Sequence, residues 1–189
     1  MRSSALLLVG IVMLGGCGSE PAATEAAPLQ PDAASLNRET GPAGVGDQLA
    51  ALRQLTVKFH DFQAAQDAGW NAKITSCMEL SGAGGMGFHY GNPAYVFDGV
   101  VRADQPELLL YEPTKNGGMK LVAVEYIIWY TDHPRDAAPP ELYGQKFKQV
   151  DSFGLWGLHA WVWQGNPSGT FADWNPNVNC DNTDDIMAM

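Results

Sequence analysis

The sequence predicts an α+β domain: one N-terminal helix packed on a mostly antiparallel sheet or small barrel, followed by an irregular C-terminal tail. Apolar residues recur at steps of three and four over residues 47–68, which is the period of an amphipathic helix. Beyond Trp70 the pattern changes to short aromatic and β-branched runs bounded by Gly, Asn and Pro. Of the 189 residues 46% are apolar and 17% are charged, a composition that excludes wholesale disorder.

The helix is expected to begin with Asp47 as its cap and to run to about Ala68. Gly69 is a natural residue to end it, because glycine readily adopts the left-handed conformation that follows many helices. One apolar stripe along this helix would face the sheet. Its members are Leu49, Leu52, Leu55, Phe59 and Phe62.

The strand candidates are residues 88–90, 95–101, 107–112, 119–130, 146–150 and 155–164. The turn sequence PTKNGG over 113–118 predicts that the third and fourth of these segments form a hairpin. Residues 131–144 are proline-rich and predict a long loop. The segment from Gly165 onward predicts no regular structure.

Residues 1–16 resemble the signal peptide of a bacterial lipoprotein. A basic start precedes an apolar run over residues 5–14, which is too short to span a bilayer, and small residues precede Cys17. The resemblance implies cleavage before Cys17 and attachment of fatty acyl chains such as palmitate. The anchor would then lie in the periplasm-facing outer membrane or at the cell surface. The alternative is an ordinary signal peptide with an incidental cysteine.

The remaining chain divides into a linker and one domain. Residues 17–46 carry the lipid-anchored cysteine and a segment rich in Ala, Pro, Glu, Thr and Gly, which predicts a flexible spacer. Residues 47–189 form the single globular domain. The net charge of −10 argues against nucleic acid as a partner and against electrostatic docking on anionic lipid. The membrane would be contacted through the lipid alone.

Two cysteines remain in the domain. In an exported protein, Cys77 and Cys180 predict a disulfide that pins the tail to the start of the sheet. The alternative, a pair of soft metal ligands, lacks the usual CxxC spacing. The absence of CxxCH from the sequence excludes a covalent c-type haem.

Glu125 is the most informative candidate for chemistry. Strand alternation places Leu121, Ala123, Glu125, Ile127 and Trp129 on one face of segment 119–130, and both faces of that segment are apolar. A carboxylate buried there needs a partner. His89, between glycines, and His159, on another apolar strand, would complete a metal site with Glu125, and Glu79 is a candidate fourth ligand.

These ligand types suit zinc, copper, manganese or non-haem iron, and two His with one carboxylate form the facial triad of iron oxygenases. Two other interpretations stay open. Glu125 can pair with a buried His or with Arg102 as a satisfied core group. It can also act with a His as acid and base in a metal-free cleft.

Aromatic residues are concentrated in the last third of the chain. Trp161, Trp163 and Tyr143 are candidates for the wall of a ligand pocket, with His133 on a lid formed by loop 131–144. The alternative is that these aromatics are core residues.

Several phrases occur together along the domain: GMGFHY at 85–90, LYEP at 110–113, VAVEY at 122–126, LHAWVW at 158–163 and WNP at 174–176. The set resembles a family of uncharacterised exported bacterial proteins. That resemblance implies export and a single domain and assigns no catalytic residue. Two functions remain as hypotheses: a lipid-anchored metalloprotein acting as a small oxygenase, hydrolase or metal-handling protein, or a non-enzymatic envelope protein that binds a small ligand or partner.

Overall fold

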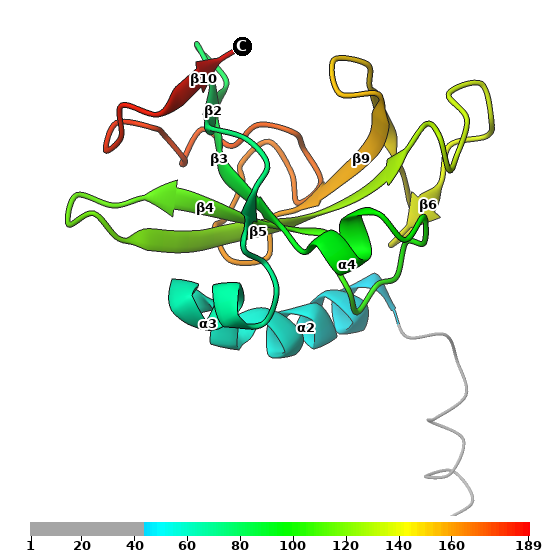
Figure 1. The fold of residues 1–189 in the computed structure, drawn as a ribbon, viewed down its shortest axis with the longest axis horizontal. Helices are drawn as coiled ribbons and strands as arrows, with labels where there is room; N and C mark the ends of the chain where they lie inside the picture. Colours follow the sequence, from blue (N-terminus) through cyan, green and yellow to red (C-terminus); the bar gives the residue numbers. More distant parts are fainter. Residues whose placement is uncertain (1–43) are drawn as a thin grey trace, which may run out of the picture. The chain divides into compact units, whose positions relative to one another are not determined.

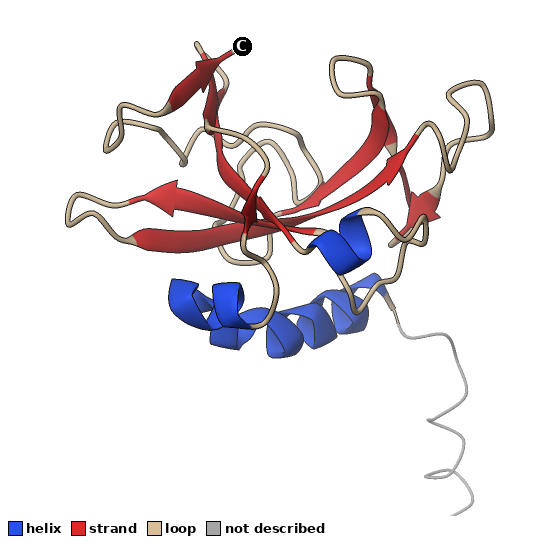
Figure 2. Ribbon diagram, in the orientation of Figure 1, coloured by secondary structure: helices blue, strands red, loops and turns tan. Residues whose placement is uncertain are grey.

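A computed structural model describes residues 44–189. The signal peptide expected over 1–16, Cys17 and nearly all of the linker therefore lie outside the described residues. Helices cover one face of a curled, mostly antiparallel sheet, which confirms the predicted α+β class (Figures 1 and 2). The helical elements are α2 (Val45–Thr56), the 3-10 turn η1 (Val57–His60), α3 (Phe62–Asp67) and the short α4 (Pro93–Val96).

The helix expected over 47–68 is divided at Asp61. The backbone of Asp61 is extended (φ −79°, ψ 107°), and its side chain accepts hydrogen bonds from the N–H groups of Gln63 and Ala64. Asp61 is therefore the cap of α3. The prediction that Asp47 caps the first helix was wrong, because Gly44 holds that position and Asp47 lies in the first turn. Gly69 has φ 109° and follows the last helical residues, as expected.

The main sheet has eight strands, in the order β10-β2-β3-β4-β5-β9-β8, with β1 pairing on β3. All described neighbours are antiparallel except β10 and β2. The strands are β1 (Ala72–Lys73), β2 (Cys77–Leu80), β3 (Gly84–Gly91), β4 (Leu108–Pro113), β5 (Met119–Trp129), β8 (Lys148–Val150), β9 (Leu155–Ala160) and β10 (Ile186–Ala188). Strands β6 (Glu141–Leu142) and β7 (Gln145–Lys146) form a separate small ribbon.

Two expectations about the strands were wrong. Residues 95–101 are not a strand: Pro93 begins the helical turn α4, and Asn92 caps it by accepting a hydrogen bond from the N–H of Ala94. The tail from Gly165 is not wholly irregular, because β10 pairs in parallel with β2 (Figure 1). The predicted hairpin is present as β4 and β5.

The sheet separates two apolar clusters. The first lies between the sheet and the helices and includes Leu52, Phe59, Tyr111 and Tyr126. The second lies on the opposite face and includes Met78, Met86, Leu108, Leu110, Ile127 and Trp161. Most of the apolar stripe expected on the helix faces the first cluster, but Leu55 is exposed.

A register shift in the hairpin changes which residues of β5 face each cluster. Leu110 pairs with Ala123 while the next residue, Tyr111, pairs with Leu121, so Val122 is left without an opposing residue. Such a bulge reverses the alternation of side chains. As a result Leu121 packs with the helix-side cluster and Val122 with the other, opposite to the expectation from strict alternation.

Glu107, which immediately precedes β4, is a buried carboxyl and gives a first prediction. Its Oε2 accepts a hydrogen bond from the N–H of Ile127, its Oε1 has no partner, and burial raises its pKa to about 8. Between about pH 4.5 and 8 the unfolded chain releases this proton and the folded chain retains it, so stability falls as the pH rises. We expect Glu107→Gln, which mimics the protonated group, to gain stability over the wild type as the pH rises through this window.

Urea unfolding of both proteins at about pH 5 and about pH 8 measures this difference. Glu141→Gln, at an exposed position, is the control and should follow the wild type at both pH values. A Glu107→Gln effect that is the same at both pH values would contradict the prediction.

Candidate metal centre

Three different strands carry His89, Glu125 and His159 to the same side of the sheet. His89 lies on β3, Glu125 on β5 and His159 on β9. Glu125 is directly opposite His159 in the β5–β9 pair. Strand β4 lies between β3 and β5, and the curl of the sheet brings His89 across it toward Glu125. The non-local pairing of the sheet thus assembles residues that are far apart in sequence.

The three side chains converge on a common point. Glu125 Oε2 is 3.4 Å from His89 Nε2 and 3.8 Å from His159 Nε2. One ligand atom from each residue lies within 4.8 Å of the other two, and all three residues are at most 6% exposed. They are therefore close enough to bind a metal ion. Two imidazole nitrogens and one carboxylate oxygen are ligands that suit several divalent transition metals.

Burial sets the protonation of the group. Desolvation lowers the pKa of both His89 and His159 to about 3, so each imidazole is neutral and keeps a lone pair for coordination. Burial also raises the pKa of Glu125 to about 8. His159 Nε2 is buried and has no hydrogen-bond partner. A bound cation at this point would satisfy that orphaned nitrogen and would favour the ionised form of Glu125.

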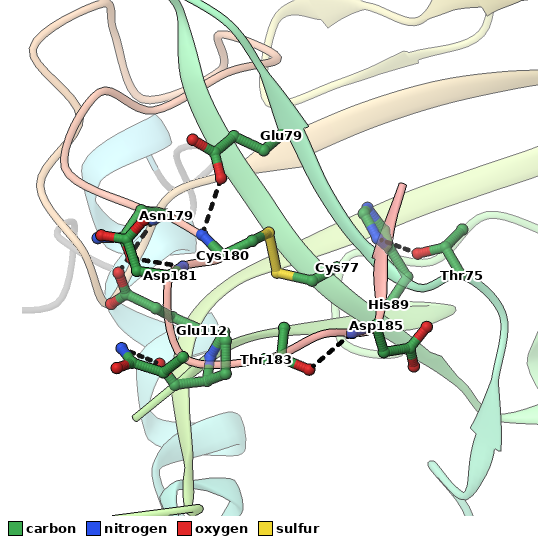
Figure 3. Close-up of a disulfide and its surroundings, with 12 residues drawn as sticks. Thr75, Cys77, Glu79, His89, Glu112, Asn179, Cys180, Asp181, Thr183 and Asp185 are labelled. Carbon is green, nitrogen blue, oxygen red and sulfur yellow. Dashed lines mark hydrogen bonds between the residues drawn. A yellow bond between two sulfur atoms is a disulfide. The ribbon is translucent and has the colours of Figure 1, made fainter. Parts of the chain in front are cut away.

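Thr75 holds the outer side of the His89 ring. Its Oγ1 lies 2.9 Å from His89 Nδ1, and Figure 3 shows this contact beside β2. When Nδ1–H donates to Thr75, the lone pair is on Nε2, the nitrogen that faces Glu125. Partners of this kind fix the tautomer and orientation of a metal-binding histidine. Sequence reasoning missed Thr75, since a lone threonine in a loop carries no motif.

We expect Thr75→Val to weaken metal binding about 10- to 100-fold while the fold persists, because valine keeps the shape and removes the hydrogen bond. Competition with a metal-binding dye measures the affinity. Thr183→Val, in which the lost hydroxyl accepts a hydrogen bond from the N–H of Asp185 in the tail, is the matched control. Equal affinities of Thr75→Val and the wild type would show that Thr75 does not support the site.

Gly157 leaves the space that the Glu125 carboxylate occupies. It lies on β9 opposite Ile127, and a Cβ built on it would be 2.9 Å from Glu125 Oε1. A glycine inside a strand often marks such a close approach. The sequence carried this signal in the phrase WGLH, two residues before His159.

We therefore expect Gly157→Ala to displace the carboxylate and to lower metal affinity at least about tenfold, since ligand geometry tolerates little displacement. Gly165→Ala is the control, because a Cβ there meets nothing within 4 Å. Titration of each variant with the metal gives the comparison. An unchanged affinity for Gly157→Ala would contradict the proposed position of the carboxylate.

The three residues line a cavity of about 240 Å³. Its walls are mainly apolar and come from the cluster opposite the helices, with contributions from Trp129, Phe153, Trp174 and the C-terminal Met189. The site therefore borders a space that is large enough for a small molecule.

Glu79 does not join the three ligands, so its prediction as a fourth ligand was wrong. Its Oε2 accepts a hydrogen bond from the N–H of Cys180 (Figure 3). Glu79 is two residues from Cys77 on β2, and alternation turns both toward the tail. The predicted disulfide between Cys77 and Cys180 is confirmed, with Cα atoms 5.9 Å apart.

The four residues expected to form an aromatic pocket do not line this cavity. Tyr143 is buried on the helix side, where its hydroxyl lies 2.7 Å from that of Tyr126. Trp163 donates from Nε1 to Thr56 Oγ1, and His133 Nε2 contacts the carbonyl of Ala138. Of these four residues, Trp161 is in contact with a candidate metal ligand, His159.

The ring of Trp161 stacks on that of His159, with an interplanar angle of 12° and its centroid 6.1 Å away. Strand β9 ends at Ala160, before the end of the predicted strand at residue 164, so Trp161 and Trp163 lie beyond the strand and need not share a face. Arg102 does not pair with Glu125, because its guanidinium binds Asp98 at the surface.

Comparison of the chain with protein-family models, with curated proteins and with solved structures found no match. Among residues 44–189, no helix has the length and apolarity needed to cross a membrane. The disulfide is a sign of an oxidising, exported environment.

Proposed function

We propose that this protein is a mononuclear metalloprotein whose ligands are His89, Glu125 and His159, and that the metal performs oxygenase-type chemistry. The observation that carries the proposal is the convergence of these three buried groups on one point at the wall of a cavity. Two histidines and one carboxylate with open positions are the ligand set of non-haem iron oxygenases. A bound iron would supply the redox chemistry, and the protein would hold it, shield it and position the substrate.

The same ligand types also occur in zinc hydrolases, so the surroundings of the site decide between the two. A hydrolase needs a free base and groups that stabilise an oxyanion near the metal. The other polar side chains lining the cavity already have hydrogen-bond or ion-pair partners: Thr75 contacts His89, Lys148 pairs with Asp173, and the Gln149 amide donates to the Arg135 carbonyl. This arrangement favours oxygenase over hydrolase chemistry.

We also propose that the domain is exported and anchored at the cell envelope through acylated Cys17. The lipoprotein-like residues before Cys17 support the anchor, and the disulfide agrees with export. Mass spectrometry of the mature protein tests this proposal. A mature chain beginning at an acylated Cys17 is the expected result, and an unmodified cysteine would contradict it.

Nitric oxide tests the iron centre directly. Full chain purified after export would be loaded with Fe(II) without oxygen and exposed to nitric oxide, which binds iron at an open position and gives a characteristic electron paramagnetic resonance signal. We expect this signal in the wild type and its loss in His159→Ala. Iron that fails to bind, or that gives the same signal in both proteins, would overturn the proposal.

A second function is favoured by one observation. With Glu125 protonated and both histidines neutral, the three side chains carry no charge in the absence of a metal, and the 3.4 Å separation allows the carboxyl to face His89 Nε2 as a core pair. The protein would then be a non-enzymatic ligand-binding protein of the envelope. Failure to take up any of iron, zinc, copper or manganese would favour this alternative.

A further inference from the structure

We infer that the cavity binds a neutral, apolar molecule of one or two rings. This inference rests on the proposed function, because the same cavity borders the proposed metal centre, and it names the class of substrate for that site.

The wall of the cavity is mainly apolar. Met78, Met86, Leu108, Ile127, Trp129 and Leu155 present thioether, aliphatic and aromatic surfaces to it. Such walls bind apolar surface through the hydrophobic effect, and methionine adapts its shape to aromatic rings. A strongly polar ligand would lose its hydration there without gaining partners.

The charged residues that line the cavity are already paired. Apart from the three candidate ligands, the charged residues lining the cavity are Lys148 and Asp173, and these form an ion pair of 2.8 Å with each other. Neither charge is therefore free for a charged substrate. The Glu125 carboxyl already has the two histidines as neighbours, since its Oε2 lies 3.4 Å from His89 Nε2 and 3.8 Å from His159 Nε2. A neutral ligand therefore leaves these groups with the partners that they already have.

The volume and the opening of the cavity also fit a small apolar molecule. A dry cavity of about 150 Å³ in another protein binds benzene, so about 240 Å³ accommodates a substituted ring or a fused pair. Ile74, Phe153 and Met189 line the cavity and are also 36–52% exposed. The exposed part of the wall therefore offers apolar surface, beside the exposed Lys148 and Gln149, which suits the entry of an apolar molecule.

The test measures binding of toluene, indole and benzoate to the metal-free full chain by NMR chemical-shift titration. We expect toluene and indole to shift signals of Leu108 and Ile127, with affinities at least tenfold higher than that of benzoate. Leu155→Trp fills the cavity and should lower the affinity for toluene at least tenfold. Leu55→Trp, the same change at an exposed position on α2, should leave it unchanged.

Metal uptake by the same samples separates this inference from the metal centre. Circular dichroism and metal uptake show whether Leu155→Trp remains folded. The comparison of toluene with benzoate uses the wild type alone and does not depend on that variant. Benzoate binding as tightly as toluene, or no binding of any neutral probe by folded protein, would overturn the inference even if metal is bound. Toluene binding that Leu155→Trp removes supports the inference even if no metal is taken up, and only the metal centre then fails.

Discussion

Glu125→Gln is expected to abolish metal binding while leaving the metal-free fold at least as stable as the wild type. The carboxylate is the only anionic ligand of the proposed set, and an amide is a poor replacement, so we expect the affinity to fall by at least about 100-fold. Glutamine has the shape and neutrality of the protonated carboxyl that burial favours. The substitution therefore replaces a buried ionisable carboxyl by a neutral amide, which does not lower the stability of the metal-free fold.

Thermal unfolding with and without metal measures both the loss of metal binding and the stability of the metal-free protein. Metal at about 100 times its dissociation constant stabilises a folded protein by about 2.7 kcal/mol, so the melting temperature of the wild type should rise and that of Glu125→Gln should not. Glu79→Gln is the control, because Glu79 lies outside the three-residue group, and it should respond to metal as the wild type does. A Glu125→Gln protein that metal stabilises as strongly as the wild type would contradict the assignment.

Removal of the disulfide should have the largest effect on stability. Cys77 and Cys180 are 103 positions apart in the sequence, and in the chain-entropy model a cross-link that closes so long a loop stabilises the fold by roughly 4–5 kcal/mol. The tail that it secures includes β10, which pairs with β2, and Met189, which lines the cavity. We expect Cys77→Ala combined with Cys180→Ala to lower the free energy of unfolding by about this amount and to loosen the cavity.

Denaturant unfolding with and without a reducing agent provides the measurement. Reductant should destabilise the wild type to nearly the level of the double variant and should leave the double variant unchanged, because no disulfide remains in its described residues. Equal stability of the oxidised wild type and the double variant would show that the cross-link does not contribute.

The candidate site was largely predictable from local sequence. Glu125 stands out because apolar residues surround it on a long strand, and His159 because it occupies the same kind of position on another strand. A carboxylate and an imidazole on covered strands need partners, and each was a reasonable partner for the other. Thr75 and the cavity wall were not predictable, because they depend on how distant segments pack.

The errors in the fold have physical causes that short windows of sequence do not contain. The bulge opposite Leu110 and Tyr111 exchanges the faces on which Leu121 and Val122 lie, although the apolar pattern of β5 fits either arrangement. Residues 95–101 have the aromatic and β-branched composition of a strand, but Asn92 and Pro93 begin a helical turn there. Strand β10 forms only by pairing with β2, more than 100 positions earlier in the sequence.

The most direct test of the central claim is elemental analysis of the full chain, purified without chelators after export, beside His89→Ala and His159→Ala. We expect about one equivalent of a transition metal in the wild type and its loss in both variants, while circular dichroism shows that the fold is retained. A folded wild type that contains no transition metal and takes none up from iron, zinc, copper or manganese solutions would contradict it.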